Sequence, residues 1–156
     1  MRKIDYTKED LTDHYGMGAI IFNYDGNKVL VQRHNKFKFY TLPVGKASLN
    51  ENPDDGIKRE LLEDVTKVQR IIRQDKKSIR RGNLITIKLI LYLVKEYYGE
   101  IKNKEPHKHE FQGFMSTDKL KKRNEEENRN PWLTNMFFSE YDNIEKETKN
   151  LSLVKK

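Results

Sequence analysis

Apolar and polar residues alternate with several different periods along the chain, and the pattern predicts a mixed α/β protein. Residues 17–23 and 28–33 are rich in β-forming residues and flank Asp25-Gly26, so we expect two strands joined by a hairpin turn. Residues 68–73 predict a short strand. Residues 84–94 are apolar on both faces, which is typical of a central strand buried between two layers.

Two segments have a helical period. The first begins at Asn52, a suitable N-cap, with Pro53 at the first helical position. Its narrow apolar stripe consists of Ile57, Leu61 and Val65, and we expect it to pack on a core.

The second helical segment begins near residues 130–131. Its apolar face is interpreted as core that covers a sheet rather than as a base-stacking pocket, and consists of Leu133, Phe137, Tyr141 and Ile144. The charged residues 119–130 form a linker-like run, which we interpret as a short helix followed by a mobile loop. Residues 145–156 predict a frayed tail.

Three carboxylates share one face of the first predicted helix. Glu60, Glu63 and Asp64 stand at positions i, i+3 and i+4, which places their Cβ atoms roughly 5 to 6 Å apart. Such a cluster repels itself unless a cation lies beside it. On its own, the charged run of residues 58–64 is more typical of a solvated helix face.

The chain around this helix resembles the Nudix box, written Gx5Ex7REUxEExGU with U aliphatic. The resemblance spans residues 45–67 and includes Gly45, Glu51, Arg59, Glu60, Leu61, Glu63 and Asp64. The distant Gly45 and Glu51 favour a functional site over a solvated face. Asp64 stands where the family usually has Glu, and Thr66 replaces the usual Gly, so we expect the helix to end without a left-handed cap.

Resemblance to MutT-like Nudix hydrolases, with no subfamily assigned, implies a fold, a reaction and a cofactor. The implied fold is of the α/β class, a Nudix-type α/β/α sandwich with a mixed β-sheet between helices. It would form a single domain over residues 1–156, with residues 1–14 as an N-terminal extension. The implied reaction is hydrolysis of a diphosphate (pyrophosphate) linkage in a nucleoside triphosphate or dinucleoside polyphosphate. Mg²⁺ is the expected cofactor, with Mn²⁺ as a substitute, because clustered carboxylates supply hard oxygen ligands.

The resemblance also implies roles for single residues. The expected metal ligands are the carbonyl of Gly45 and the carboxylates of Glu60, Glu63, Asp64 and Glu110. Glu60 is either a metal ligand or the group that orients or deprotonates the attacking water, and both roles stay open. The catalytic residues would be Glu60, Glu63 and Arg59. Arg59 would support the site by pairing with Glu51 and a helix carboxylate.

Glu110 lies in the polar stretch after the long apolar strand, where many family members carry an acid that reaches the metals or the water. Glu105 is the second candidate for the acid that reaches the metals or the attacking water. His107 and His109 come just before Glu110, and we expect both to be exposed. The residues expected to bind substrate come before or at the approach to the box and are Arg33, Lys36, Lys38 and Tyr40.

Composition bears on the partner. The 156 residues carry a net charge of +7 and no cysteine, which favours an anionic partner and is compatible with a reducing cytoplasm. No apolar run approaches the ~20 residues of a membrane-spanning helix, so we expect no membrane partner. The expected partner is a nucleotide, and the oligomeric state stays open.

RNA is the second candidate partner, because a further group of cations follows the box. They are Arg70, Arg73, Lys76, Lys77, Arg80 and Arg81, and are equally consistent with a solubilising surface. Two alternatives therefore accompany the main prediction. One is an RNA 5′-end pyrophosphohydrolase or decapping enzyme, and the other is a catalytically weak nucleotide-binding Nudix module.

Overall fold

The computed structural model describes residues 14–23, 25–36, 38–48, 50–81, 85–98, 100–129 and 131–148. In chain order the elements are β1 (His14–Ile20), β2 (Val29–His34), β3 (Tyr40–Thr41), β4 (Val44–Ser48), α1 (Pro53–Asp64), β5 (Lys67–Arg81), β6 (Ile85–Tyr98), β7 (His109–Met115), α2 (Thr117–Glu126) and α3 (Trp132–Thr148). Within these ranges, no helix is both long enough and apolar enough to cross a membrane.

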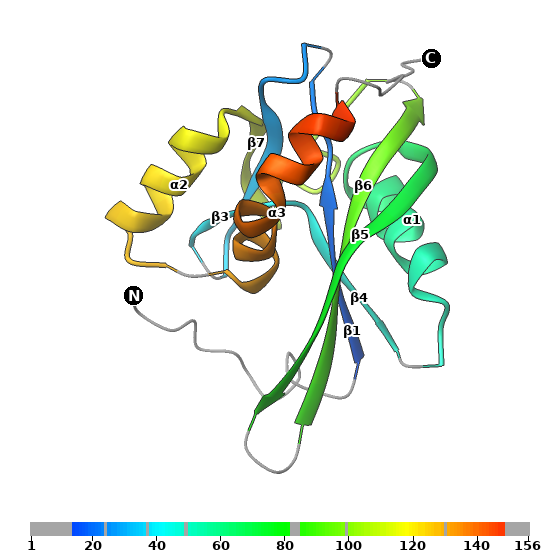
Figure 1. The fold of residues 1–156 in the computed structure, drawn as a ribbon. Coiled ribbons are helices and arrows are strands. Elements are labelled where there is room, and N and C mark those ends of the chain that lie inside the picture. Colours follow the sequence, from blue (N-terminus) through cyan, green and yellow to red (C-terminus); the bar gives the residue numbers. More distant parts are fainter. Residues whose placement is uncertain are drawn as a thin grey trace.

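The strands form two sheets that lie between the helices (Figure 1). The larger sheet has the order β4-β1-β6-β5, in which β1 and β6 are parallel and the other pairs antiparallel. The smaller sheet has the order β3-β2-β7 and is antiparallel. Helix α1 lies on one side of the sheets, whereas α2 and α3 lie on the other. This α/β/α arrangement with a mixed sheet confirms the predicted fold class.

Apolar side chains fill the space on both sides of the larger sheet. The apolar stripe predicted for α1 packs with Met17 and Tyr92 in one buried cluster. Leu133 and Phe137 of α3 pack with Leu91 in the other. Because successive side chains of a strand point to opposite faces, β6 supplies both clusters, as expected of a central strand.

Local signals define both ends of α1. The side chain of Asn52 accepts a hydrogen bond of 2.9 Å from the backbone N–H two residues later, as predicted for an N-cap. At the other end, the N–H groups of Val65 and Thr66 both donate to the carbonyl of Leu61 at 2.8 Å. Val65 has φ −134°, so the helix ends without a left-handed residue, in agreement with the presence of Thr66.

The predicted turn after β1 is confirmed, but the predicted hairpin ladder is wrong. Gly26 has φ 72°, a conformation that favours glycine, and a bridge joins Phe22 to Val29. Beyond this bridge, β1 and β2 separate into different sheets. The short strand predicted at residues 68–73 is also wrong in extent, because β5 pairs with β6 as far as Arg81.

The charged run before α3 is folded rather than linker-like. Its short helix is present as α2, which is N-capped by Ser116 and buries Leu120 and Asn124. Helix α3 continues to Thr148, so the beginning of the predicted tail is helical. Residues 1–13 and 149–156, which make up nearly all of the predicted extension and the rest of the tail, lie outside the described residues.

Candidate active site

Gly45 and Glu60 touch where β4 packs against α1. A Cβ atom built on Gly45 would lie 2.4 Å from Cγ and 2.9 Å from Cδ of Glu60, closer than real Cβ atoms approach. Gly56 makes a similar approach from the helix, since its Cβ would lie 2.9 Å from the Cβ of Ala47. The two glycines therefore set the distance between β4 and α1, and Gly45 leaves the room that the Glu60 side chain occupies.

Arg59 lies within ion-pair distance of three carboxylates. Its Nε is 3.5 Å from Oε1 of Glu51, and its Nη1 is 3.3 Å from Oε1 of Glu60 and 3.7 Å from Oε1 of Glu63. Its Nη2 donates to the carbonyl of Lys46 at 3.4 Å. The predicted pairing of Arg59 with Glu51 and a helix carboxylate is present, and one guanidinium reduces the repulsion among these acids.

Glu60 is the most enclosed of these acids. Its side chain is 17% exposed, against 53% for that of Glu63. Burial raises the pKa of the Glu60 carboxyl above its ordinary value; Lys108 and Arg59 oppose this shift, and Glu63 adds to it. A poorly solvated carboxylate of this kind gains from an added cation. The side chain of Asp64 lies outside the part of the structure that is described.

A cavity of about 370 Å³ lies beside Glu60, a volume typical of sites for small molecules. Gly45 and Glu60 line it together with three lysines, Lys36, Lys46 and Lys108. The remaining wall is largely neutral, and includes Gln32, His34, Phe39, Thr41, Leu89, His109, Trp132 and Leu133. Three ammonium groups and one carboxylate give the lining a positive balance, which suits an anionic ligand with an apolar part.

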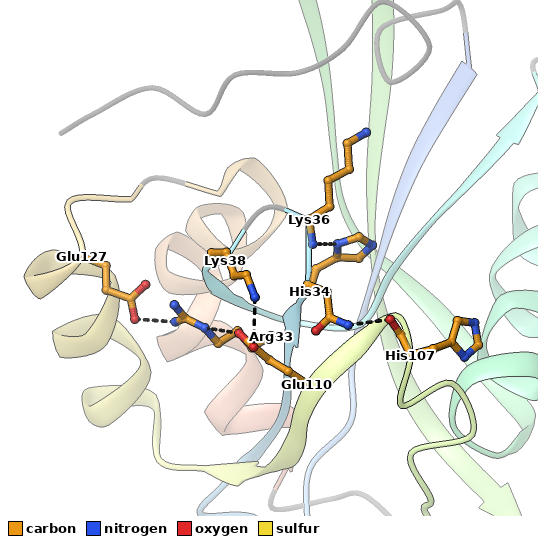
Figure 2. Close-up of polar contacts among 8 residues, drawn as sticks. Arg33, His34, Lys36, Lys38, His107, Glu110 and Glu127 are labelled. Carbon is orange, nitrogen blue, oxygen red and sulfur yellow. Dashed lines mark hydrogen bonds and ion pairs between the residues drawn. The ribbon is translucent and has the colours of Figure 1, made fainter.

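His34 and His109 face each other in the wall of this cavity, with ring centroids 5.7 Å apart at 82°. The backbone N–H of Lys36 donates to Nδ1 of His34 at 2.9 Å, so the neutral ring carries its proton on Nε2 (Figure 2). His109 is 3% exposed, and burial lowers its pKa to about 4, with Lys108 and His34 acting in the same direction. The predicted exposure is thus correct for His107 and wrong for His109.

Arg33, Lys38 and Glu110 form a separate ion-pair group (Figure 2). Arg33 Nε is 2.7 Å from Glu110 Oε1, and its Nη1 is 2.7 Å from Glu127 Oε1 on the segment that follows α2. Lys38 Nζ lies 3.1 Å from Glu110 Oε2. The ring of Tyr40 stacks on the Arg33 guanidinium, whose carbon lies 4.9 Å from the ring centroid.

Strand alternation separates this group from the cavity. Arg33 and His34 are neighbours on β2 and point to opposite sides, so His34 reaches the cavity and Arg33 does not (Figure 2). Of the four residues expected to bind substrate, Lys36 lines the cavity. Glu110, expected to bind metal, does not line it and instead pairs with Arg33 and Lys38.

Several cavity residues were not predicted from the sequence. Lys46 follows Gly45 directly, and its place beside the box could have indicated its position. Lys108 and Trp132 carry no such signal, because the packing of distant segments brings them to the cavity.

A second unpredicted group holds the beginning of α1. Asp54 Oδ1 accepts hydrogen bonds of 2.6 Å from the Tyr92 hydroxyl on β6 and 2.7 Å from Arg73 Nε on β5. Partial burial would raise the pKa of Asp54, but these hydrogen bonds outweigh it and hold the pKa below its ordinary value. The N-terminal turn of α1 is therefore fixed to the larger sheet.

The box acids suit a magnesium ion in chemistry and number. Within the described residues, no three Asp, Glu or His side chains form a closed ligand group. Mg²⁺ commonly uses one or two carboxylates, retains several waters and completes its shell with substrate phosphates. Glu60 and Glu63 offer two hard oxygen donors on one helix face, and the enclosed Glu60 lacks full compensation of its charge. The residues present therefore fit a hydrated divalent ion.

Comparison with solved structures finds the same fold. The MutT NUDIX hydrolase from Burkholderia pseudomallei is 22% identical, covering 69% of this chain and 85% of that chain with a TM-score of 0.58. The MutT protein from Methanosarcina mazei Go1 is 18% identical, covering 88% and 98% with a TM-score of 0.62. The NUDIX domain of Shewanella oneidensis NrtR, complexed with ADP ribose, is 15% identical, covering 76% and 83% with a TM-score of 0.57.

A comparison with curated protein sequences found no match. The family model of the NUDIX domain matches residues 12–136, which is well over half of the chain and contains the whole box. The chain therefore belongs to the NUDIX domain family, the Nudix hydrolases, which generally cleave nucleoside diphosphate-linked substrates.

Proposed function

We propose that this protein hydrolyses the diphosphate linkage of a small nucleotide, a nucleoside triphosphate or a dinucleoside polyphosphate, with Mg²⁺ or Mn²⁺ as cofactor. One observation carries the proposal. The enclosed carboxylate of Glu60 lies in the wall of a cavity whose other charged lining residues are lysines. A carboxylate and several cations at one cavity match the needs of a polyphosphate, whose negative charge repels an attacking hydroxide.

The proposed roles rest on the family resemblance and, for Glu60 and Arg59, also on the geometry. A bound divalent ion would neutralise phosphate oxygens and activate water. Glu63 and Asp64 would hold that ion together with the Gly45 carbonyl, while Glu60 would be a further ligand or would orient the water. Arg59 keeps the acids in place through its contacts with Glu51 and the helix carboxylates, and so acts as a positioning residue.

Substrate contact is assigned by position relative to the cavity. Lys36 lines the cavity, which supports its assignment as a phosphate-binding residue. Arg33, Lys38 and Tyr40 are engaged in the separate group around Glu110, and we assign that group to the junction between the sheet and the segment after α2 rather than to substrate or metal.

Replacement of Glu63 with glutamine tests the proposal. The variant keeps the size of the side chain but loses its charge, so turnover of a panel of nucleotides with Mg²⁺ or Mn²⁺ should be abolished while the fold is retained. Asp55→Asn on the exposed side of the first turn of α1 is the matched control and should keep full activity. Full activity of Glu63→Gln would refute the assignment. Nucleotide binding with no product from any substrate would instead indicate the catalytically weak binding module.

Cleavage of RNA 5′ ends is the second candidate function. The observation that favours it is that all six cations of the group that follows the box fall on one strand, β5, at the edge of the larger sheet. Hydrolysis of triphosphorylated or capped RNA should then weaken steeply as salt rises, and Arg80→Ala with Arg81→Ala should flatten that dependence. A rate that is independent of salt and of both substitutions would exclude this function.

A further inference from the structure

The segment between β6 and β7 rests on the C-terminal end of α1. The ammonium of Lys104 donates to the carbonyl of Leu62 at 2.9 Å, and the N–H of Lys102 donates to the carbonyl of Val65 at 3.3 Å. A cation at this end of a helix is favoured by the helix dipole. The segment is therefore attached to the helix that carries the box acids, within about one and a half turns of Glu60.

The end of this segment is held from the other side by β2. The N–H of Lys108 donates to the carbonyl of Glu105 at 2.9 Å. The carbonyl of Lys108 accepts from the N–H of Asn35, which directly follows β2, at 2.8 Å. The next residue, His109, pairs with His34 in the strand ladder. The side-chain amide of Asn35 also donates to the carbonyl of His107 (Figure 2). The backbone at position 108 is thus fixed between two elements.

This backbone position brings the Lys108 side chain to the cavity that Glu60 and Gly45 line. The charge of Lys108, like that of Arg59, opposes the rise in the pKa of the Glu60 carboxyl. Its ion pair with Glu105 is long, at 3.9 Å, and its side chain is 36% exposed. Lys108 and Glu60 therefore line the same cavity, and the Lys108 side chain remains partly exposed.

We propose that Lys108 is a catalytic residue that binds the phosphate chain of the substrate beside Glu60. The catalytic role of Lys108 rests on the proposed hydrolysis of a nucleotide, whereas its binding of phosphate does not. If Glu60 held a divalent ion, that ion would balance the carboxylate in place of the Lys108 ammonium. This ammonium stands on a flexible four-carbon stem and needs no backbone movement to turn to a phosphate oxygen. A charged hydrogen bond to phosphate then replaces its attraction to Glu60.

The test measures binding of inorganic pyrophosphate in the presence of Mg²⁺ by calorimetry, and then nucleotide hydrolysis with Mg²⁺. Lys108→Met should weaken pyrophosphate binding roughly 10- to 100-fold, the worth of one charged hydrogen bond, whereas Lys108→Arg should restore most of it. In hydrolysis, Lys108→Met should lower kcat more than it raises KM, because negative charge develops on the leaving-group oxygen as the P–O bond breaks.

Two controls separate a phosphate contact from a structural role. Lys102→Met removes a cation from the same segment at a side chain that is 68% exposed, and should bind pyrophosphate as the wild type does. Glu105→Gln breaks the ion pair but keeps the Lys108 ammonium, and should also bind normally. Thermal unfolding should be close to wild type throughout, since exposed ion pairs contribute little. Lys108→Gln serves as a second charge removal if the methionine variant melts early.

The outcomes distinguish the two proposals. Unchanged pyrophosphate binding in Lys108→Met and Lys108→Gln, or equal weakening in Glu105→Gln, would overturn the role of Lys108 and leave hydrolysis by the wild type intact. Loss of pyrophosphate binding in both Lys108→Met and Lys108→Gln would support the phosphate contact, whether or not the wild type hydrolyses a nucleotide. Absence of hydrolysis by the wild type would instead refute the proposed function.

Discussion

Replacing Gly45 with alanine is expected to damage the site without unfolding the protein. The new methyl group would lie 2.4 Å from Glu60 Cγ, while ordinary contact begins at 3.4 Å, so that atom must move by about 1 Å (3.4 − 2.4). The methyl would also lie 3.0 Å from Glu60 Cβ, so turning the outer side chain does not relieve the whole overlap and α1 must also shift. Displacing a reacting group by about 1 Å costs on the order of 100-fold in rate.

We therefore expect kcat for nucleotide hydrolysis to fall about 100-fold in Gly45→Ala, with a loss of about 1–3 kcal/mol in the free energy of unfolding from overpacking. Steady-state kinetics with Mg²⁺ and urea unfolding measure the two effects. Gly113→Ala is the control, because its Cβ would lie 3.1 Å from the end of the exposed Phe111 ring, which can turn away. That variant should keep its activity within about 2-fold and its stability within about 1 kcal/mol.

A double-mutant cycle then assigns the loss to the contact with Glu60. Glu60→Ala removes Cγ and Cδ, the two atoms that the new methyl would overlap most. In that background, Gly45→Ala should lower the free energy of unfolding by at least about 1 kcal/mol less than it does in the wild type, as expected of residues in contact. Additive losses, or a Gly45→Ala enzyme as active as Gly113→Ala, would show that the close approach does not position Glu60.

Three further predictions concern the groups around the site. Arg59→Lys should lower kcat about 10-fold in nucleotide assays but change stability by less than about 1 kcal/mol, because a point charge cannot bridge three carboxylates and the pairs are partly exposed; wild-type kinetics would contradict it. Tyr92→Phe should cost about 1–2 kcal/mol in urea unfolding at neutral pH. Since the pKa of Asp54 is lowered, its contribution is present above the unfolded value of about 3.9 and is lost as pH falls through the folded pKa, so the cost should shrink toward pH 2 and a constant cost would refute this. Glu127→Gln should lower stability by about 0.5–1.5 kcal/mol through the loss of its pair with Arg33, while hydrolysis stays unchanged; a fall in kcat would show that this group serves the site.

Local signals predicted the parts of the fold that depend on neighbours in sequence. The N-cap at Asn52 and the apolar stripe of α1 are formed within a few residues, and both are present as predicted. Helix α2 shows the limit of such signals. Its charged sequence has little to bury and looks like a linker, yet Leu120 joins the main core and Ser116 caps the helix.

Strand register determined which side chains reach the cavity, and the sequence alone did not predict this grouping. His109 looks like a loop residue, but its pairing with His34, far away in the chain, places it in the cavity wall. The same register turns Arg33 away from the cavity and toward Glu110, because neighbours on β2 face opposite sides. Residue types in polar stretches therefore predicted candidate chemistry, whereas their grouping depended on pairings that no short motif contains.

The two cations that act on the Glu60 carboxylate have different side-chain geometries, and this difference separates the roles that we propose for them. Arg59 contacts three carboxylates and the Lys46 carbonyl, so moving it would cost several interactions and separate the loop from α1. Lys108 has a long ion pair and a flexible stem, although its backbone is fixed. Under the proposed function, a divalent ion bound at Glu60 would take the place of the Lys108 ammonium rather than of Arg59. Arg59 would keep the acids together, and the Lys108 ammonium would turn to a phosphate oxygen within the same cavity.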